Sequence, residues 1–73
     1  MNIKEKVGLR IKLLRNIKCL SQSNLSDDSN MDRSYLASVE KGYRNISIVN
    51  IEKITNALGV SLEEFFNDEC FNM

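Results

Sequence analysis

Apolar residues recur at helical spacing in two long stretches of the chain, and mostly polar residues fill the positions between them. The first stretch runs from about Ile3 to Ile17 and the second from about Ile48 to Leu58. Their apolar positions are Ile3, Val7, Ile11, Leu13, Leu14 and Ile17 in the first stretch, and Ile48, Val49, Ile51, Ile54, Ala57 and Leu58 in the second. Residues three or four apart share one face of a helix. The pattern therefore predicts two amphipathic helices that bury their apolar faces in one core.

The region between these helices, residues 21–45, predicts two further short helices joined by a tight turn. Ser21 and Asp32 are good N-caps for helices over about 22–29 and 33–41. Asn30 lies at the turn, and Asn tolerates the left-handed backbone that such a turn needs. The residues suited to contact between two crossed helices are Leu25, Ser26, Met31, Leu36 and Val39. The pattern is that of a helix-turn-helix, a unit that reads DNA with its second helix.

A fifth helix is predicted after Gly59, which would end the helix over 48–58. Ser61 and Glu64 have the spacing of a capping box at its start. The large apolar residues in and after this helix are Leu62, Phe65, Phe66 and Phe71. One small bundle does not readily hide so much apolar surface, so we expect a homodimer interface within about 48–71, anchored by Phe65 or Phe66. In the alternative interpretation both rings complete the core of the monomer.

The chain has 73 residues, enough for one domain, 1–73, with a single small core. It contains no His, the commonest general base and metal ligand. Cys19 and Cys70 match no zinc or redox spacing, and free thiols indicate a reducing, cytoplasmic environment. No apolar run is long enough to span a membrane, and the N-terminus is not a signal peptide. We therefore expect no enzyme activity, no metal, no other cofactor and no membrane partner.

Charge is distributed unevenly, although the formal net charge is zero. Residues 1–18 carry six basic side chains and one acidic side chain, whereas residues 61–73 carry four acidic side chains and no basic ones. A fold that separates the two ends would offer a basic face to DNA, while ordinary solvated surfaces are the other interpretation. The neutral total predicts weak non-specific DNA binding.

Several motifs taken together resemble the XRE/Cro-type helix-turn-helix family of small DNA-binding regulators, over roughly residues 7–66. The residues that carry the resemblance are Gln22, Leu25-Ser26, Asn30, Val39-Glu40-Lys41-Gly42 and Ala57-Leu58-Gly59-Val60-Ser61. The resemblance implies an all-α, compact five-helix domain of the lambda-repressor-like type, with its helix-turn-helix over about 22–41. A narrower resemblance, to controller proteins of restriction–modification systems, is carried by Asn30-Met31-Asp32-Arg33-Ser34-Tyr35 and Arg44-Asn45-Ile46-Ser47.

The residues predicted to read DNA bases lie on the third helix. Arg33 is the strongest candidate, because a guanidinium can bind guanine O6 and N7 together. Ser34, Tyr35 and Ser38 face the same side and are further candidates, although Tyr35 could instead pack within the domain. Contacts to the DNA backbone or minor groove are predicted for Ser21, Gln22, Lys41, Arg44, Asn45 and Ser47.

Other roles follow from the family resemblance. It implies a structural salt bridge between Arg15 and Glu40, with an exposed phosphate contact as the alternative for Arg15. Asp27 and Asp28 form either a solvated helix face or an acidic surface that contacts RNA polymerase. Cys19 stands where the family usually has Gly, so a different or slightly strained loop is expected there.

The sequence thus predicts a dimeric, sequence-specific transcriptional regulator that binds a palindromic operator in double-stranded DNA. By resemblance it would control its own operon in a restriction–modification system. A phage-type repressor or an antitoxin remains the alternative within DNA binding. A protein-interaction module is the alternative from another class, and it predicts no DNA footprint.

Overall fold

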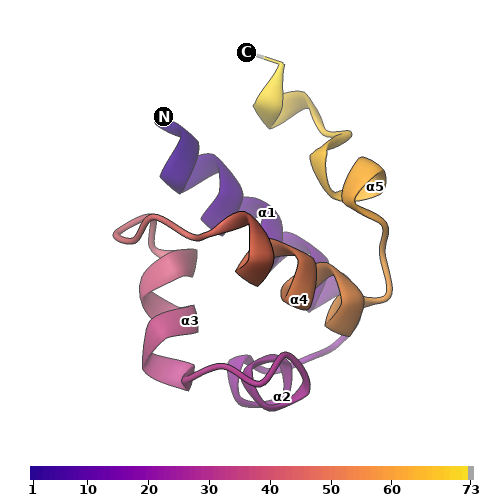
Figure 1. Cartoon of the computed structure of the whole chain (residues 1–73). Helices are drawn as coiled ribbons and strands as arrows, with labels where there is room; N and C mark the ends of the chain where they lie inside the picture. Colours follow the sequence, from indigo (N-terminus) through magenta and orange to yellow (C-terminus); the bar gives the residue numbers. More distant parts are fainter. Residues whose placement is uncertain (73) are drawn as a thin grey trace.

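The computed structural model describes residues 1–72 and, over this range, consists of helices and the turns between them. The elements are α1 (Ile3–Ile17), α2 (Gln22–Asp28), α3 (Arg33–Glu40), α4 (Ile48–Leu58), α5 (Leu62–Phe66) and a short 3₁₀ helix (Glu69–Phe71). Helices α1 and α4 cross at the centre of the molecule, α2 and α3 lie below them, and α5 stands at the side (Figure 1). The predicted all-α, five-helix fold is confirmed. In residues 1–72 no helix has the length and apolar character needed to cross a membrane.

Polar side chains cap the start of every helix, because the first N–H groups of a helix lack partners within it. Asn2 and Glu5 form a full capping box before α1, a cap that the sequence analysis does not predict. Asp32 Oδ1 accepts a hydrogen bond from the N–H of Ser34 at 3.0 Å, and this bond fixes the first turn of α3. Ser61 Oγ accepts from the N–H of Glu64 at 3.0 Å. The reciprocal bond of the predicted capping box is not formed among the described residues.

The core is formed by apolar side chains on the inward faces of α1, α2, α3, α4 and α5. Its fully buried or nearly buried residues are Val7, Ile11, Leu14, Leu25, Leu36, Val39, Ile51, Ile54, Leu58, Val60 and Phe65. The predicted apolar face of α1 was too wide: Ile3, Leu13 and Ile17 are 62%, 46% and 65% exposed. A helix in a small bundle buries only the narrow face turned to its neighbours, and positions at its ends or beside that face remain in solvent. For the same reason Ile48 and Val49, in the first turn of α4, are exposed.

The contact between α1 and α3 depends on Gly8, which is buried. A Cβ atom at this position would collide with the carbonyl oxygen of Val39 and lie 2.8 Å from that of Glu40. The missing side chain therefore lets the backbone of α1 approach the C-terminal end of α3 directly. This close approach holds the end of α3 against the scaffold.

Within residues 1–72, two residues other than glycine have left-handed backbone. Asn30, in the turn between α2 and α3, has φ 56°, as its side chain type predicted. Cys19, between α1 and α2, has φ 59°. Cys lacks the tolerance of Gly for this conformation, so the loop stores some strain, as the sequence predicted.

Arg10 ties α5 to α1. Its Nε donates to the carbonyl oxygen of Phe65 at 2.8 Å, and its Nη2 donates to that of Glu64 at 2.9 Å. A third contact joins Arg10 Nη1 to Asp68 Oδ1 at 3.4 Å. Hydrogen bonds from the thiol and then the backbone N–H of Cys70 lower the pKa of Asp68, and Arg10 adds to this effect. Burial, followed by the contact with Asp68, raises the pKa of the Cys70 thiol, which makes it a poor nucleophile at neutral pH.

Candidate nucleic-acid interface

The N-terminal half of α3 presents polar side chains to solvent. Arg33 and Ser34 are exposed, and Tyr35 and Ser38 are partly buried. Leu36, from the opposite side of the helix, is fully buried in the core. The structure therefore places the four predicted base-reading residues away from the core. Ser38 shares one face of α3 with Tyr35 and Ser34, at spacings of three and four residues, and Arg33 lies at the first position of the helix.

A buried carboxylate holds the other end of α3. Glu40 accepts hydrogen bonds from Arg15 Nε at 2.8 Å and Nη2 at 3.0 Å, so the salt bridge expected from the family resemblance is present. Gln22 Nε2 donates to the same carboxylate at 3.1 Å, and Arg15 Nη1 also donates to the carbonyl oxygen of Leu20 at 2.9 Å. The hydrogen bond and charge of Glu40 raise the pKa of Arg15 further above its usual range, against the opposing effect of burial. One carboxylate thus fixes the orientation of α3 relative to α1 and α2.

Removing one partner of such a pair would leave a buried charge without compensation, which typically costs about 3–5 kcal/mol. The side chains of Arg15 and Glu40 are only 11% and 3% exposed, so the pair belongs to this buried class. The alternative of an exposed phosphate contact for Arg15 is wrong. Gln22 lies at the start of α2, where its side chain braces α3 through Glu40.

Tyr35 connects α3 with the loop and the helix that follow it. The guanidinium of Arg44 lies 5.3 Å from the centre of the Tyr35 ring, in a cation–π contact. Asn50 Nδ2, from the first turn of α4, donates a hydrogen bond to the Tyr35 hydroxyl at 3.2 Å. Sequence reasoning missed Asn50, because no local pattern indicates a contact between side chains 15 residues apart.

The loop from α3 to α4 carries the remaining predicted DNA contacts. Its residues Lys41, Arg44, Asn45 and Ser47 are exposed. Ser47 Oγ accepts a hydrogen bond from the N–H of Asn50 at 3.1 Å and so caps α4. This loop follows the end of α3 directly, and Figure 1 shows it as the long connection that leads back across the molecule to α4. Its cationic and amide groups therefore lie close to the polar face of α3.

The exposed face of α2 carries different groups. Asp27 and Asp28 are both exposed. Ser21, also exposed, caps this helix by accepting a hydrogen bond from the N–H of Asn24 at 3.0 Å. These two carboxylates would repel DNA phosphates. Of α2, therefore, the N-terminal end is the part suited to contact the DNA backbone.

The predicted dimer anchors occupy two different environments. Phe65 is fully buried in the monomer core, so its placement at an interface is wrong. Its ring lies 4.9 Å from that of Phe66 in an edge-to-face contact, and Phe66 lies 5.1 Å from Phe71. Leu62 and Phe66 are 42% and 39% exposed, whereas Phe71 is partly buried against the core. The small core needs one of the two phenylalanines, and helical geometry turns the next residue outward.

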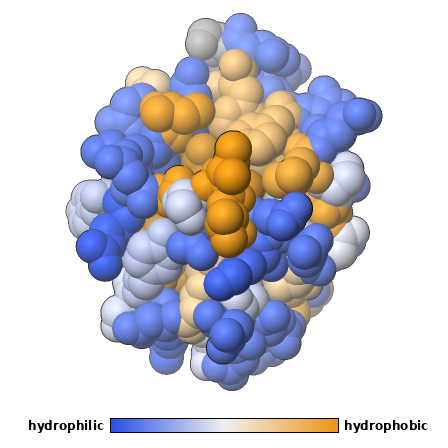
Figure 2. All heavy atoms as spheres, viewed as in Figure 1, coloured by the Kyte–Doolittle hydropathy of each residue, from blue (hydrophilic) through white to orange (hydrophobic). Residues whose placement is uncertain are grey.

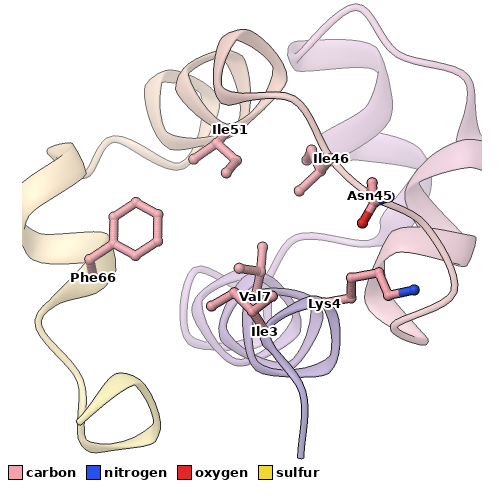
Figure 3. Close-up of a pocket in the computed structure, with 7 residues that line it drawn as sticks. All are labelled: Ile3, Lys4, Val7, Asn45, Ile46, Ile51 and Phe66. Carbon is pink, nitrogen blue, oxygen red and sulfur yellow. The ribbon is translucent and has the colours of Figure 1, made fainter.

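An exposed apolar surface accompanies Leu62 and Phe66. Apolar atoms gather in the middle of the face on which α4 lies in front (Figure 2). Ile48 and Val49 at the start of α4 are 79% and 60% exposed. Beside them is a pocket of about 180 Å³, lined by Ile3, Lys4, Val7, Asn45, Ile46, Ile51 and Phe66. Figure 3 shows the ring of Phe66 on one side of this pocket, facing Ile46 and Asn45 across it.

Two short helices joined by a left-handed turn, with a polar outward face on the second, define a helix-turn-helix domain of the DNA-binding kind. The helix-turn-helix family model matches residues 11–65. The chain belongs to this family, in its XRE-type branch, as the resemblance predicted. The control protein C.MunI from Mycoplasma sp. is 44% identical over 68 residues, which cover 92% of each chain.

Solved structures of restriction–modification controller proteins have the same fold. C.AhdI from Aeromonas hydrophila matches with a TM-score of 0.83 and 46% identity, over 86% of this chain and 96% of that one. C.Esp1396I, solved as a tetramer in complex with its natural 35-base-pair operator, matches with a TM-score of 0.85 and 36% identity. That match covers 90% of this chain and 87% of the other.

Proposed function

We propose that this chain is a sequence-specific DNA-binding transcriptional regulator, and that it acts as the control protein of a restriction–modification system. The observation that carries the proposal is the outward polar face of α3, fixed by the buried Arg15–Glu40 pair on a fold that C.Esp1396I uses while bound to its operator. The similarity to the control protein C.MunI extends over 92% of each chain, and this supports the proposal that the chain is a control protein.

In the proposed complex α3 enters the major groove with its N-terminal half towards the bases. Arg33 binds a guanine through O6 and N7, and Ser34, Tyr35 and Ser38 contact neighbouring base edges or the groove wall. Lys41, Arg44 and Asn45 approach phosphates or the adjacent minor groove, with Ser21, Gln22 and Ser47 at the edges of the contact. No step of this function needs a bond to be made or broken, so we propose a regulator without catalytic activity.

The proposed active form is a homodimer. The exposed apolar side chains of α4 and α5 (Ile48, Val49, Leu62 and Phe66) supply a surface that a second copy would cover. A two-fold axis there would place the two α3 helices in successive major grooves, about 34 Å apart. The operator is then an imperfect palindrome, because the symmetry of the dimer requires similar half-sites.

We further propose that the operator lies upstream of the gene for this chain, in the cytoplasm of its host, and that the exposed pair Asp27 and Asp28 contacts RNA polymerase there. The rival within DNA binding is a phage-type repressor or an antitoxin, which neighbouring genes would distinguish from a controller. Genes for a methyltransferase and an endonuclease would support the controller assignment.

The first experiment measures binding of the purified protein to its own upstream DNA and to a shuffled fragment of equal length, over a series of salt concentrations. Tighter binding to the native fragment, with two protomers for each palindrome, is the expected result. Equal affinity and an equal salt dependence on both fragments would reduce the function to non-specific DNA binding. Absence of binding to either would favour a protein-interaction module instead.

A further inference from the structure

One hydrogen bond joins the outward face of α3 to α4. It runs from Asn50 Nδ2 to the hydroxyl of Tyr35 over 3.2 Å, and the guanidinium of Arg44 lies 5.3 Å from the centre of the same ring. The Tyr35 side chain is therefore held at its hydroxyl by one residue and on its ring face by another. Asn50 itself is no part of the DNA contact set proposed above.

We propose that Asn50 is a positioning residue for base readout. By binding the hydroxyl of Tyr35, it fixes the orientation of that ring in the free protein. It thereby increases the difference in affinity between operators that differ at the base pair that Tyr35 contacts. This inference rests on the proposed function, since it assigns Tyr35 to the DNA surface.

The two partners of Tyr35 differ in how firmly they are placed. Arg44 is exposed in the loop, and a DNA phosphate would compete with the ring for its guanidinium. Asn50 is partly buried in the first turn of α4, where Ser47 Oγ binds its backbone N–H at 3.1 Å. When Arg44 turns towards DNA, Asn50 remains to hold the ring. A ring already fixed loses less conformational entropy on binding.

The direction of the hydrogen bond also restricts what Tyr35 can recognise. Its hydroxyl oxygen accepts a hydrogen bond from Asn50, so the hydroxyl's own hydrogen is directed to another acceptor. In the major groove the acceptors are O6 and N7 of guanine, N7 of adenine and O4 of thymine, whereas the amino group of cytosine is a donor. Tyr35 held in this way therefore favours a base edge that presents an acceptor.

The test compares discrimination, not affinity alone, in four proteins: Asn50→Ala, Tyr35→Phe, the double variant, and Asn56→Ala. Asn56 is an exposed residue of the same helix and controls for loss of an amide from α4. Dissociation constants are measured for the footprinted upstream site and for each of its single-base-pair variants, at one salt concentration. The variants Tyr35→Ala and Arg33→Ala identify which base pairs depend on each of these side chains.

Asn50→Ala and Tyr35→Phe should each reduce discrimination at the Tyr35 base pair by roughly two- to tenfold, the range expected for one hydrogen bond. The double variant should lose no more discrimination than Tyr35→Phe alone, because once the hydroxyl is gone Asn50 has no bond to Tyr35 left to lose. In these variants, discrimination at the base pair that Arg33 contacts should match that of the original protein. Asn56→Ala should have the same dissociation constants as the original protein for every site. Additive losses, or an equal loss of affinity for every site variant, would overturn the inference.

A second measurement needs no DNA. The side-chain amide protons of Asn50, observed by NMR in the free protein, should shift when Tyr35→Phe removes the hydroxyl, while those of Asn56 should not. Unchanged Asn50 shifts would overturn the inference and leave the proposed function standing. Failure of the original protein to prefer its upstream DNA would overturn the proposed function, and the inference about base readout with it.

Discussion

Arg33 and Lys41 lie at the two ends of α3, and their side chains are suited to different DNA groups, a base edge and a phosphate. Arg33 follows the Asp32 cap, where a rigid guanidinium fork can reach two acceptors on one base. Lys41 follows the last turn and carries a single mobile charge, which is suited to a phosphate. Phosphates are the same at every base pair, so only one of the two ends can distinguish sequences.

Replacing these residues should therefore have different signatures. Arg33→Ala should weaken operator binding by about 1–3 kcal/mol and relax the preference at one base pair, whereas Lys41→Ala should weaken all sequences alike. Competition binding with native and substituted duplexes measures both effects, and each variant serves as the control for the other. Uniform weakening by Arg33→Ala would remove Arg33 from base readout.

Cys19 shows strain at a single residue. Its φ of 59° is a conformation that glycine adopts freely and that other L-residues adopt at a cost. Cys19→Gly should therefore raise the free energy of unfolding by about 0.5–1 kcal/mol, after the greater freedom of glycine in the unfolded chain is counted. Urea denaturation with an unchanged m-value measures this change.

Asn30→Gly is the matched control for Cys19→Gly, because Asn30 has nearly the same φ but a side chain that tolerates it. Its effect on the free energy of unfolding should be smaller. Destabilisation by Cys19→Gly would mean that the thiol makes a contact worth more than the strain.

At the level of elements, the local signals were sufficient for the helices. Caps and glycines predicted the starts of α2, α3, α4 and α5 and the ends of α3 and α4 to within one or two residues, because these signals act within a single turn. The short 3₁₀ helix over Glu69–Phe71 was not predicted. The contacts that decide how elements sit against one another were not predictable in this way. The contact of Gly8 with α3 and that of Arg10 with α5 join residues far apart in the chain. Neither composition nor periodicity predicts such contacts.

The same distinction applies to the site. Arg33 and Ser34 could be assigned from their place after a helix cap. Phe65 was misplaced, since two adjacent phenylalanines in a five-residue helix do not reveal which one enters the core until the neighbouring helices are in place.

Arg10 gives a prediction about one element. Arg10→Gln removes the two hydrogen bonds to the carbonyl oxygens of Phe65 and Glu64, so the amide protons of α5 should exchange about tenfold faster or more. Those of α3, held through Glu40, should keep their protection. Hydrogen exchange followed by NMR measures both sets, and Lys12→Gln, an exposed residue of the same helix, is the control. An equal loss of protection in every helix would contradict a local role for Arg10.

At the scale of the whole molecule, the formal net charge of zero limits the electrostatic part of DNA binding. If Lys41 and Arg44 are the main phosphate contacts, a dimer brings four such cations to DNA. The logarithm of the binding constant should then fall with the logarithm of salt concentration with a slope of about −4. Titrations of the upstream duplex at several salt concentrations measure this slope, and Lys41→Ala should reduce it by about two units for the dimer. A slope near −9 would require many more phosphate contacts than these loops supply.

The contacts of Arg10 and Arg15 within the domain affect how many copies of the protein a cell needs to occupy the operator. Both lie in the basic N-terminal segment, yet one is bound to α5 and the other to Glu40, so neither guanidinium is directed towards DNA. A genome offers on the order of 10⁶–10⁹ competing non-specific sites, and a protein with fewer outward cations leaves each of them sooner. Most copies then stay unbound between encounters, so a small number suffices to fill the operator. We therefore expect operator occupancy to follow the number of copies closely.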